Sequence, residues 1–311
     1  MEQVMMPGVE KKMSRVVLGS MVFSPEKEKA SYAILDAFFA AGGSAIDTAH
    51  VYASGDSERL IGMWMKQRKN RTKVFLIDKG GHPHANLPRP RLGPEELESD
   101  LSESLRRLQT DYVDLYMLHR DDSQIPVGPI IDYLNQQIRT GRIRTIAASN
   151  WEHERIQEAN DYAGEHGLEG FVVSSANLSL AVPKEPLWKG VLSVGKNARD
   201  WHHDRGFPLM PWSSQARGFF GGQFSPEKRD DKNMVRVYYN DDNFERLRRA
   251  KALGAQKGFS AIQIALGYVL HQPFPIFPII GPATLQELES SLGALQIQLS
   301  DSEMRWLNLE D

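Results

Sequence analysis

The chain has 311 residues, of which 41% are hydrophobic, and a formal net charge of -3. This length is normal for one large α/β domain and supplies enough apolar residues for a sizeable core. The near balance of 37 basic and 40 acidic residues gives no electrostatic reason to expect nucleic acid or an anionic membrane as a partner. The absence of cysteine excludes disulfides, thiolate metal sites and a cysteine nucleophile.

The first nine residues lack the basic patch and apolar stretch of a signal peptide, and no segment has the uninterrupted apolar length that spans a bilayer. We therefore expect no membrane partner and a cytoplasmic location.

Eight short apolar runs, many of them β-branched, predict strands. In chain order they are 16–19, 44–47, 74–78, 112–119, 144–149, 171–175, 208–212 and 277–281. Two longer segments between strands, 180–207 and 221–242, are expected to form loops. In a barrel, the loops that follow strands lie over the catalytic face.

Helical patterns separate most of these strands. The clearest helix begins at Pro94, with two glutamates in its first turn, and a second spans 260–271 and ends before Pro273. One face of the first helix carries Leu97, Leu101, Leu105 and Leu108. Strands that alternate with helices pair in parallel, and eight such units predict a (β/α)8 TIM barrel formed by one domain, 1–311, rather than an open doubly wound sheet.

Ionisable side chains lie at or just after three of the predicted strand ends: Asp47 with Tyr52, then Lys79, then His119. An ammonium stabilises a phenolate, a carboxylate keeps the ammonium charged, and an imidazole can donate a hydrogen bond to a carbonyl oxygen. Together these groups could move a proton to or from an oxygen, with no metal or nucleophile if the other reactant delivers hydride. Taken alone, Asp47 and Tyr52 could equally be a capping aspartate and a packed tyrosine.

The same residues lie in motifs that resemble the aldo-keto reductases. The resemblance covers essentially the whole chain through 43–52, 55–62, Lys79, 111–120, 141–144, 149–150, 212–218 and 279–292. It implies a TIM-barrel oxidoreductase that binds NADP(H) or NAD(H) without a Rossmann domain and acts on a small carbonyl or alcohol substrate. It also implies a catalytic tetrad of Asp47, Tyr52, Lys79 and His119, in which Tyr52 is the general acid in reduction and the general base in oxidation.

The resemblance further implies the residues that hold the cofactor. Ser149 and Asn150 match the pair that binds the nicotinamide carboxamide, and Ser175 stands where the family usually has glutamine. Trp212 matches the ring that stacks on the nicotinamide. The loop around the pyrophosphate would contain Ser213, Gln215 and Arg217.

The adenosine end of the cofactor would lie along Gly281, Glu287 and Ser291. NADP-specific members of the family carry a cation where this chain has Ala283, Thr284 and Glu287. A carboxylate repels a 2'-phosphate but can accept a hydrogen bond from a free ribose hydroxyl. A cation from another loop could restore the phosphate site, so both cofactors remain open.

Candidate substrate-pocket residues lie just beyond a strand or in a long loop: Met21, His50, Trp151, Trp188 and Trp201. Aromatic and histidine side chains suit an aldehyde, a ketone or a sugar-like carbonyl compound. The histidines at 82, 84, 202 and 203 are interpreted as loop residues lining a polar pocket, and no metal site is expected.

Two other functions fit parts of this pattern. The resemblance includes cofactor-binding regulatory subunits such as the β subunits of voltage-gated potassium channels. A barrel hydrolase could use Asp47 or Glu58 as an acid, but a glycosidase needs a second carboxylate across the pocket. The remaining candidate, Asp78, should face away from Lys79 because side chains alternate along a strand.

Overall fold

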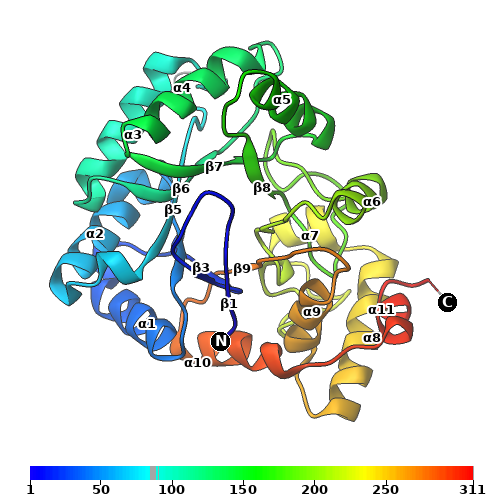
Figure 1. Ribbon diagram of the computed structural model, residues 1–311. Helices are drawn as coiled ribbons and strands as arrows, with labels where there is room; N and C mark the ends of the chain where they lie inside the picture. Colours follow the sequence, from blue (N-terminus) through cyan, green and yellow to red (C-terminus); the bar gives the residue numbers. More distant parts are fainter. Residues whose placement is uncertain (85–88, 90, 311) are drawn as a thin grey trace. The chain divides into compact units, whose positions relative to one another are not determined.

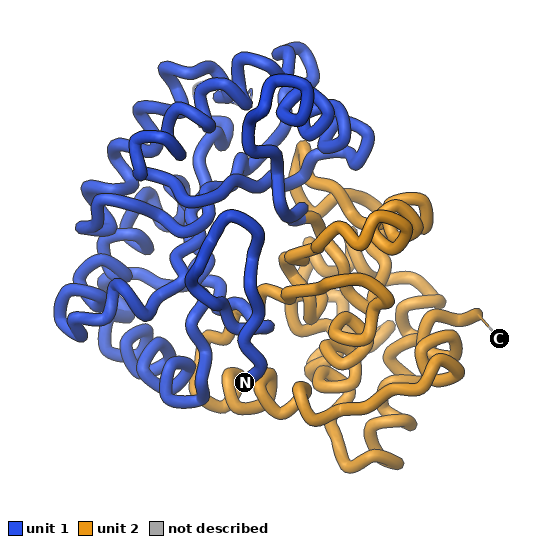
Figure 2. Tube along the Cα trace, in the orientation of Figure 1, with its two compact units in different colours: residues 1–175 blue, residues 176–311 orange. Residues whose placement is uncertain are grey.

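The computed structural model describes residues 1–84, 89 and 91–310, and the chain divides into two units. Unit 1 is Met1–Ser175 and unit 2 is Ala176–Asp311 (Figure 2). The two units are described separately.

Unit 1 contains six of the predicted strands in one parallel sheet. They are β3 (Val17–Gly19), β4 (Ala45–Asp47), β5 (Phe75–Gly80), β6 (Val113–Leu118), β7 (Ile143–Ser149) and β8 (Phe171–Ser175). Each strand pairs with the next in the chain, so their order in the sheet follows the sequence. Because all six are parallel, their carboxyl ends lie along one edge of the sheet.

A helix connects each strand of unit 1 to the next. These helices are α1 (Glu28–Ala40), α2 (Asp56–Arg68), α3 (Pro94–Leu108), α4 (Val127–Arg139) and α5 (His153–Glu165). Figure 1 shows them outside the curved sheet. Three short 3-10 turns, η1 (Pro25–Lys27), η2 (Tyr52–Gly55) and η3 (Arg71–Lys73), complete the connections. The repeated strand–helix unit is the one that the sequence predicts.

Helix α3 illustrates why these segments are helical. Pro94 occupies its first turn, and Glu96 accepts a hydrogen bond from the Gly93 amide at 3.2 Å. Leu97, Leu101 and Leu108 are fully buried on one face. Burial of each leucine side chain contributes roughly 1.5–3 kcal/mol, so this apolar face fixes the helix on its neighbours.

The amino terminus contains a feature that the sequence did not predict. Strands β1 (Gln3–Val4) and β2 (Met13–Ser14) form a separate antiparallel pair. Two residues in each strand are too few to produce a readable alternation of apolar and polar side chains.

Unit 2 contains most of its secondary structure as helices. Its elements are α6 (Lys196–Arg205), η4 (Ala216–Gly218), α7 (Lys232–Tyr238), α8 (Asp241–Lys257), α9 (Ala261–Leu270), β9 (Ile279–Ile280), α10 (Leu285–Gly293), η5 (Ala294–Gln296) and α11 (Asp301–Leu307). The predicted loops 180–207 and 221–242 therefore each contain a helix, α6 and α7 respectively. His202 and His203 lie on α6, so their interpretation as loop residues was wrong.

The predicted strand 208–212 forms only isolated bridges. Leu209 bridges Ile276 in parallel, and the amides of Phe277 and Ile279 donate to the carbonyls of Leu209 and Pro211, both at 2.9 Å. Two prolines, at 208 and 211, have no amide hydrogen to donate, so a continuous ladder cannot form. Within the described ranges, no helix has the length and apolarity needed to cross a bilayer.

Candidate active site

Asp47 is the last residue of β4, and the chain then turns sharply to bring Tyr52 back toward it. Backbone hydrogen bonds tie this turn to β5: the Thr48 amide donates to Ile77 and the His50 amide donates to Lys79, both at 2.9 Å. Ala53 and Ser54 have positive φ angles of 47° and 55°. Left-handed backbone at non-glycine residues is uncommon and concentrates at functional sites.

Gly55 ends this turn and is required there. Its φ is 89°, and an added Cβ would lie 2.4 Å from the Arg107 guanidinium. Arg107 in turn donates to the His50 carbonyl at 3.1 Å and to Glu58 at 2.8 Å. The turn that carries Tyr52 is therefore fixed between the sheet and helices α2 and α3.

Lys79 connects the other two groups. Its Nζ donates to Asp47 Oδ1, to the Tyr52 hydroxyl at 3.2 Å and to the Thr48 carbonyl at 3.3 Å. Asp47 and Lys79 are almost completely buried. Burial opposes the charged ammonium, but Asp47 and Tyr52 together raise the pKa of Lys79. An ammonium ion is therefore held in contact with the tyrosine hydroxyl.

The Lys79 ammonium by itself would lower the pKa of Tyr52. Burial raises it above the ordinary value, and this effect exceeds the lowering by Lys79. Burial removes the water that stabilises a phenolate, and the nearby ammonium compensates for only part of this loss. Tyr52 is thus a protonated phenol at neutral pH, ready to act as an acid. Burial likewise raises the pKa of Asp47, against the opposing effect of Lys79.

His119 follows β6 directly, and its amide donates to the Gly80 carbonyl at 2.8 Å. Its ring stands edge-on to the Tyr52 ring, with centroids 5.7 Å apart. Burial lowers the pKa of His119 well below its ordinary value, with Lys79 and Arg120 adding to the effect. Its Nδ1 is buried with no hydrogen-bond partner among the described residues. A neutral imidazole with unused bonding capacity therefore stands beside the phenol.

The ends of β7 and β8 bring three more predicted residues together. Ser149 pairs in register with Ser175, and the Asn150 amide donates to the Ser175 carbonyl at 2.8 Å. The Asn150 side chain donates to the His119 carbonyl at 3.2 Å, and its φ is 59°. These polar side chains lie at the carboxyl edge that also carries the tetrad.

In unit 2, two of the predicted cofactor residues, Gln215 and Ser291, are in direct contact. Three non-glycine residues of the loop that follows Trp212 have positive φ, namely Ser213, Ala216 and Arg217. Ser291 on α10 donates to Gln215 at 3.2 Å, which ties this loop to the helix. At Gly281, no atom of the described residues, apart from the glycine and its chain neighbours, lies within 4 Å of the position a Cβ would occupy. Strained backbone beside an open glycine suits the close approach of a ligand.

Glu287 is engaged at the start of α10. Its carboxylate accepts a hydrogen bond from the Ala283 amide at 2.7 Å, and its own amide donates to the Thr284 hydroxyl at 3.1 Å. The Glu287 carboxylate therefore occupies the N-terminus of α10, a position that would otherwise favour a phosphate.

The candidate pocket residues of unit 2 have different surroundings. The centroids of the Trp188 and Trp212 rings lie 5.9 Å apart. The Arg217 guanidinium lies 5.6 Å from the centroid of the Trp188 ring. Trp201 packs on Phe207 at 4.9 Å, within its own segment. Trp188 therefore belongs with the cofactor candidates.

Three candidates belong to unit 1. Met21 is 51% exposed. His50 contacts Glu103 on α3 at 2.9 Å through Nε2, so its side chain faces that helix. Trp151 is 2% exposed, packs on Phe171 at 5.2 Å and donates to the Arg120 carbonyl at 3.2 Å. Trp151 thus stabilises the segment that follows β6.

The sequence interpretation gave no role to Arg120 and treated His82 only as a loop histidine. The His82 ring lies 4.8 Å from the His119 ring. Arg120 is 7% exposed and donates to the His119 carbonyl at 2.8 Å. The available signal was position, because Arg120 directly follows His119 and His82 lies three residues after Lys79.

A group of potential metal ligands lies on the α3 side of the sheet. Atoms of His50, His84 and Asp100 lie within 4.8 Å of one another. However, Arg91 Nη1 contacts Asp100 at 2.6 Å and His84 at 2.9 Å. A guanidinium already provides the positive charge at this position, and it would repel a metal ion.

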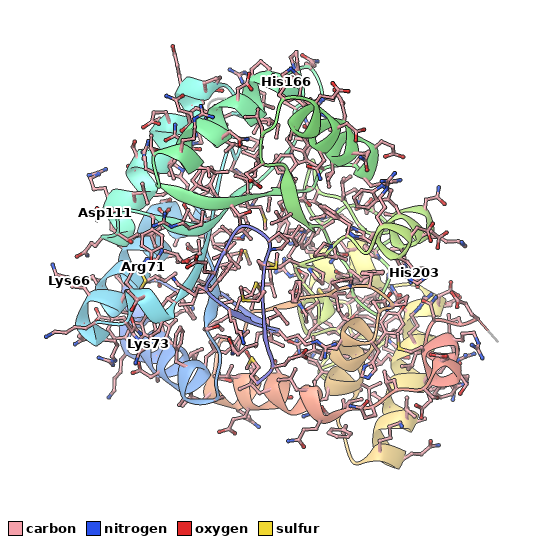
Figure 3. All side chains as sticks on the ribbon, in the orientation of Figure 1. Lys66, Arg71, Lys73, Asp111, His166 and His203 are labelled. Atoms are coloured by element: carbon pink, nitrogen blue, oxygen red, sulfur yellow. The ribbon has the colours of Figure 1, made fainter. Side chains whose placement is uncertain are left out.

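One surface hollow of unit 1 lies away from these residues. It measures about 360 Å³ and is lined by Met65, Lys66, Lys69, Arg71, Thr72 and Gln109. Lys66, Arg71 and Lys73 lie at the periphery of unit 1 in Figure 3. Arg71 and Lys73 precede β5, whereas Lys79 lies near its end, so the hollow adjoins the opposite edge of the sheet.

Comparison with known proteins identifies the family. The model of the Aldo/keto reductase family matches residues 15–308. Norsolorinic acid reductase stcV of Emericella nidulans is 29% identical, over 97% of this chain and 79% of its own length. The aryl-alcohol dehydrogenase [NADP(+)] of Phanerodontia chrysosporium is 26% identical, over 97% and 83%. An uncharacterized oxidoreductase of Bacillus subtilis, YrpG, is 28% identical, over 96% and 92%.

A solved structure agrees in fold. The thermostable aldo-keto reductase Tm1743, determined with the inhibitor epalrestat, superposes with a TM-score of 0.74 at 22% identity, over 100% of both chains. The chain belongs to the aldo-keto reductase family, and its predicted α/β barrel class is confirmed. It is an oxidoreductase that transfers hydride between a nicotinamide cofactor and a carbonyl or alcohol substrate.

Proposed function

We propose that Tyr52 is the proton donor for carbonyl reduction and the proton acceptor for alcohol oxidation. The observation that carries this proposal is the position of Lys79 Nζ, which donates to both Tyr52 and Asp47. The nicotinamide cofactor, when bound, supplies the hydride in reduction and takes it up in oxidation. As negative charge develops on the substrate oxygen, the Tyr52 hydroxyl delivers its proton, and the phenolate left behind is stabilised by the ammonium.

Asp47 and His119 act on either side of this step. Asp47 keeps Lys79 protonated and oriented, because a buried ammonium without a counter-charge loses its proton readily. His119 is neutral and has unused bonding capacity, so it can orient the substrate oxygen by a hydrogen bond without competing for the proton. Tyr52 therefore transfers the proton, and His119 orients the substrate oxygen.

The cofactor contacts follow from the family resemblance and the local structure of each unit. Ser149, Asn150 and Ser175 would bind the carboxamide, and Trp212 would stack on the ring. Ser213, Gln215 and Arg217 would hold the pyrophosphate, with Gly281, Glu287 and Ser291 at the adenosine end. The family match to residues 15–308 spans both units and supports one barrel domain over 1–311. A cytoplasmic location stays a prediction.

The experiment that tests catalysis is a steady-state assay of nicotinamide absorbance with a panel of aldehydes, ketones and sugars. The wild type should turn over at least one carbonyl class with NADH or NADPH, and Tyr52→Phe should not. Absence of turnover by the folded wild type, or equal turnover by the variant, would contradict the proposal. Tight cofactor binding with no turnover and a stable protein partner would instead favour a regulatory subunit.

Glu287 is the residue on which cofactor preference should depend. Its charge opposes a 2'-phosphate at the start of α10, so Glu287→Lys should raise the NADPH to NADH ratio of kcat/KM by about tenfold. Glu287→Gln is the matched control, since glutamine can still accept the Ala283 amide bond while removing the charge, and it should produce a smaller shift in the same direction. Titration of each cofactor into the apo protein checks the result. An unchanged ratio in both variants would exclude Glu287 as the determinant.

A further inference from the structure

Arg120 is a buried cation beside the tetrad that the mechanism above does not use. It directly follows His119 at the carboxyl end of β6 and is 7% exposed. Its Nη1 donates to the His119 carbonyl at 2.8 Å. The carbonyl of Arg120 itself accepts from the Trp151 indole at 3.2 Å. The backbone and one nitrogen of this side chain are therefore fixed at the catalytic edge of the sheet.

The guanidinium has no counter-charge in the described part of the chain. No carboxylate oxygen among the described residues lies within 4.0 Å of it. The adjacent Asp121 pairs instead with Arg155, whose Nε lies 3.2 Å and 3.1 Å from its two oxygens. Burial lowers the pKa of Arg120 to about 10, and the opposing influence is Coulombic attraction to Tyr52 in its phenolate form. Buried arginines are almost always paired, so an unpaired one indicates a missing anion.

The other charges around Tyr52 do not supply that anion. Asp47 is already in contact with Lys79. Burial lowers the pKa of both His119 and His82, so both imidazoles are neutral near pH 7. The group of side chains around the phenol therefore carries one positive charge in excess, and that charge belongs to Arg120.

Stabilisation of the Tyr52 phenolate does not account for the position of the Arg120 side chain. Lys79 already donates to the Tyr52 hydroxyl at 3.2 Å. Within the described residues, the Arg120 side chain makes its hydrogen bond to the His119 carbonyl and none to that hydroxyl. A guanidinium has five N–H donors in a planar fork that matches a carboxylate. Most of this capacity is left for a ligand.

We propose that the Arg120 guanidinium binds a carboxylate on the substrate, and that the preferred substrates are aldehydes or ketones with a carboxylate within a few bonds of the carbonyl. This inference rests on the proposed function, since the carbonyl must reach Tyr52 and His119. The Arg120 guanidinium donates to the His119 carbonyl and its charge acts on both His119 and Tyr52, so the substrate carboxylate must lie within a few bonds of the carbonyl. Arg120 selects and positions the substrate, and the proton still comes from Tyr52.

The test compares an acid with its neutral ester. Phenylglyoxylate and methyl phenylglyoxylate present the same ketone with and without the negative charge. The ratio of kcat/KM for acid over ester should fall about 100-fold in Arg120→Gln, since a buried charge pair is lost, and by a smaller factor in Arg120→Lys. Arg139→Gln removes an exposed arginine at the end of α4 and should leave the ratio at the wild-type value. An unchanged ratio in Arg120→Gln would overturn the proposal.

A binding measurement separates this inference from the proposed catalysis. Phenylacetate is titrated calorimetrically into wild type and Arg120→Gln, each saturated with NAD+ or NADP+. The wild type should bind at least about tenfold more tightly. Equal affinities, or no binding by the wild type, would overturn the role of Arg120 whether or not turnover is seen. Arg120-dependent binding without turnover of any carbonyl would contradict the proposed catalysis alone.

Discussion

Lys79 and Asp78 are consecutive buried residues of β5, and their side chains lie on opposite sides of the sheet. Lys79 contacts Asp47 and Tyr52 at the carboxyl edge. The charged neighbour of Asp78 on the other side is Glu58 on α2, and Ser104 on α3 lies close to it. The Asp78 side chain therefore points away from that of Lys79, as the alternation of side chains along a strand predicts. A glycosidase mechanism, which needs two carboxylates in one pocket, is not supported by this arrangement.

The two sides differ in what their ionisable groups contact. On the Asp78 side, Arg107 contacts Glu58 and Glu103, both at 2.8 Å, and Asp100 accepts from the Gly81 amide at 2.9 Å. The Arg107–Glu58 contact joins α3 to α2, and the Asp100 bond joins α3 to the end of β5. On the Lys79 side, one buried histidine nitrogen and one guanidinium keep unused capacity near a phenol. Buried atoms without a hydrogen-bond partner among the described residues occur on both sides, since both Asp78 oxygens, Glu58 Oε1 and Ser104 Oγ also lack one. The Lys79 side is distinguished instead by an ammonium in direct contact with a phenol.

Among variants that keep Tyr52, the largest expected effect on kcat is that of Asp47→Asn. Loss of the carboxylate leaves the Lys79 ammonium buried without a counter-charge, so Lys79 loses its proton more readily and no longer supports Tyr52. We expect kcat to fall by about 100-fold or more in the carbonyl reductase assay. Asp78→Asn is the matched control, a buried aspartate on the other side of the sheet, and a comparable fall in its kcat would contradict the division between the sides.

Arg107→Met should damage the structure more than the chemistry. It leaves the fully buried Glu58 carboxylate without its partner, which costs about 3 kcal/mol in the free energy of unfolding. Chemical denaturation monitored by tryptophan fluorescence measures this loss. If the unfolding midpoint is unchanged while turnover collapses, the α2–α3 side takes part in catalysis and the comparison fails.

The sequence predicted the strand ends of the site because their signals are local. Asp47, Lys79 and His119 each end or follow an apolar run, and motif spacing located Tyr52. The strand at 208–212 was less predictable because Pro208 and Pro211 interrupt its pairing. The sequence could not show that Arg120 lacks a counter-charge. This depends on the pairing of Asp121 with Arg155, which lies 34 residues further along the chain.

The smallest expected effect is the pH dependence of Asp78. Burial, increased by the charge of Glu58, raises its folded-state pKa well above 3.8. Its contribution to stability is therefore present below the unfolded pKa and is lost as pH rises toward the folded pKa, by up to about 1.4 kcal/mol per pH unit. Asp78→Asn removes this loss, so its unfolding free energy relative to the wild type should increase from pH 4 upward. A difference that is constant with pH would mean that Asp78 is ionised in the folded protein.

The most direct test of the account is Tyr52→Phe, measured for turnover and for cofactor affinity in the same preparation. Phenylalanine keeps the ring beside His119 and removes the hydroxyl that contacts Lys79. We predict that kcat falls by about 1000-fold, while the dissociation constants of NADH and NADPH, from fluorescence titration, change by less than about threefold. A large loss of cofactor affinity, or turnover close to the wild-type rate, would contradict Tyr52 as the group that transfers the proton.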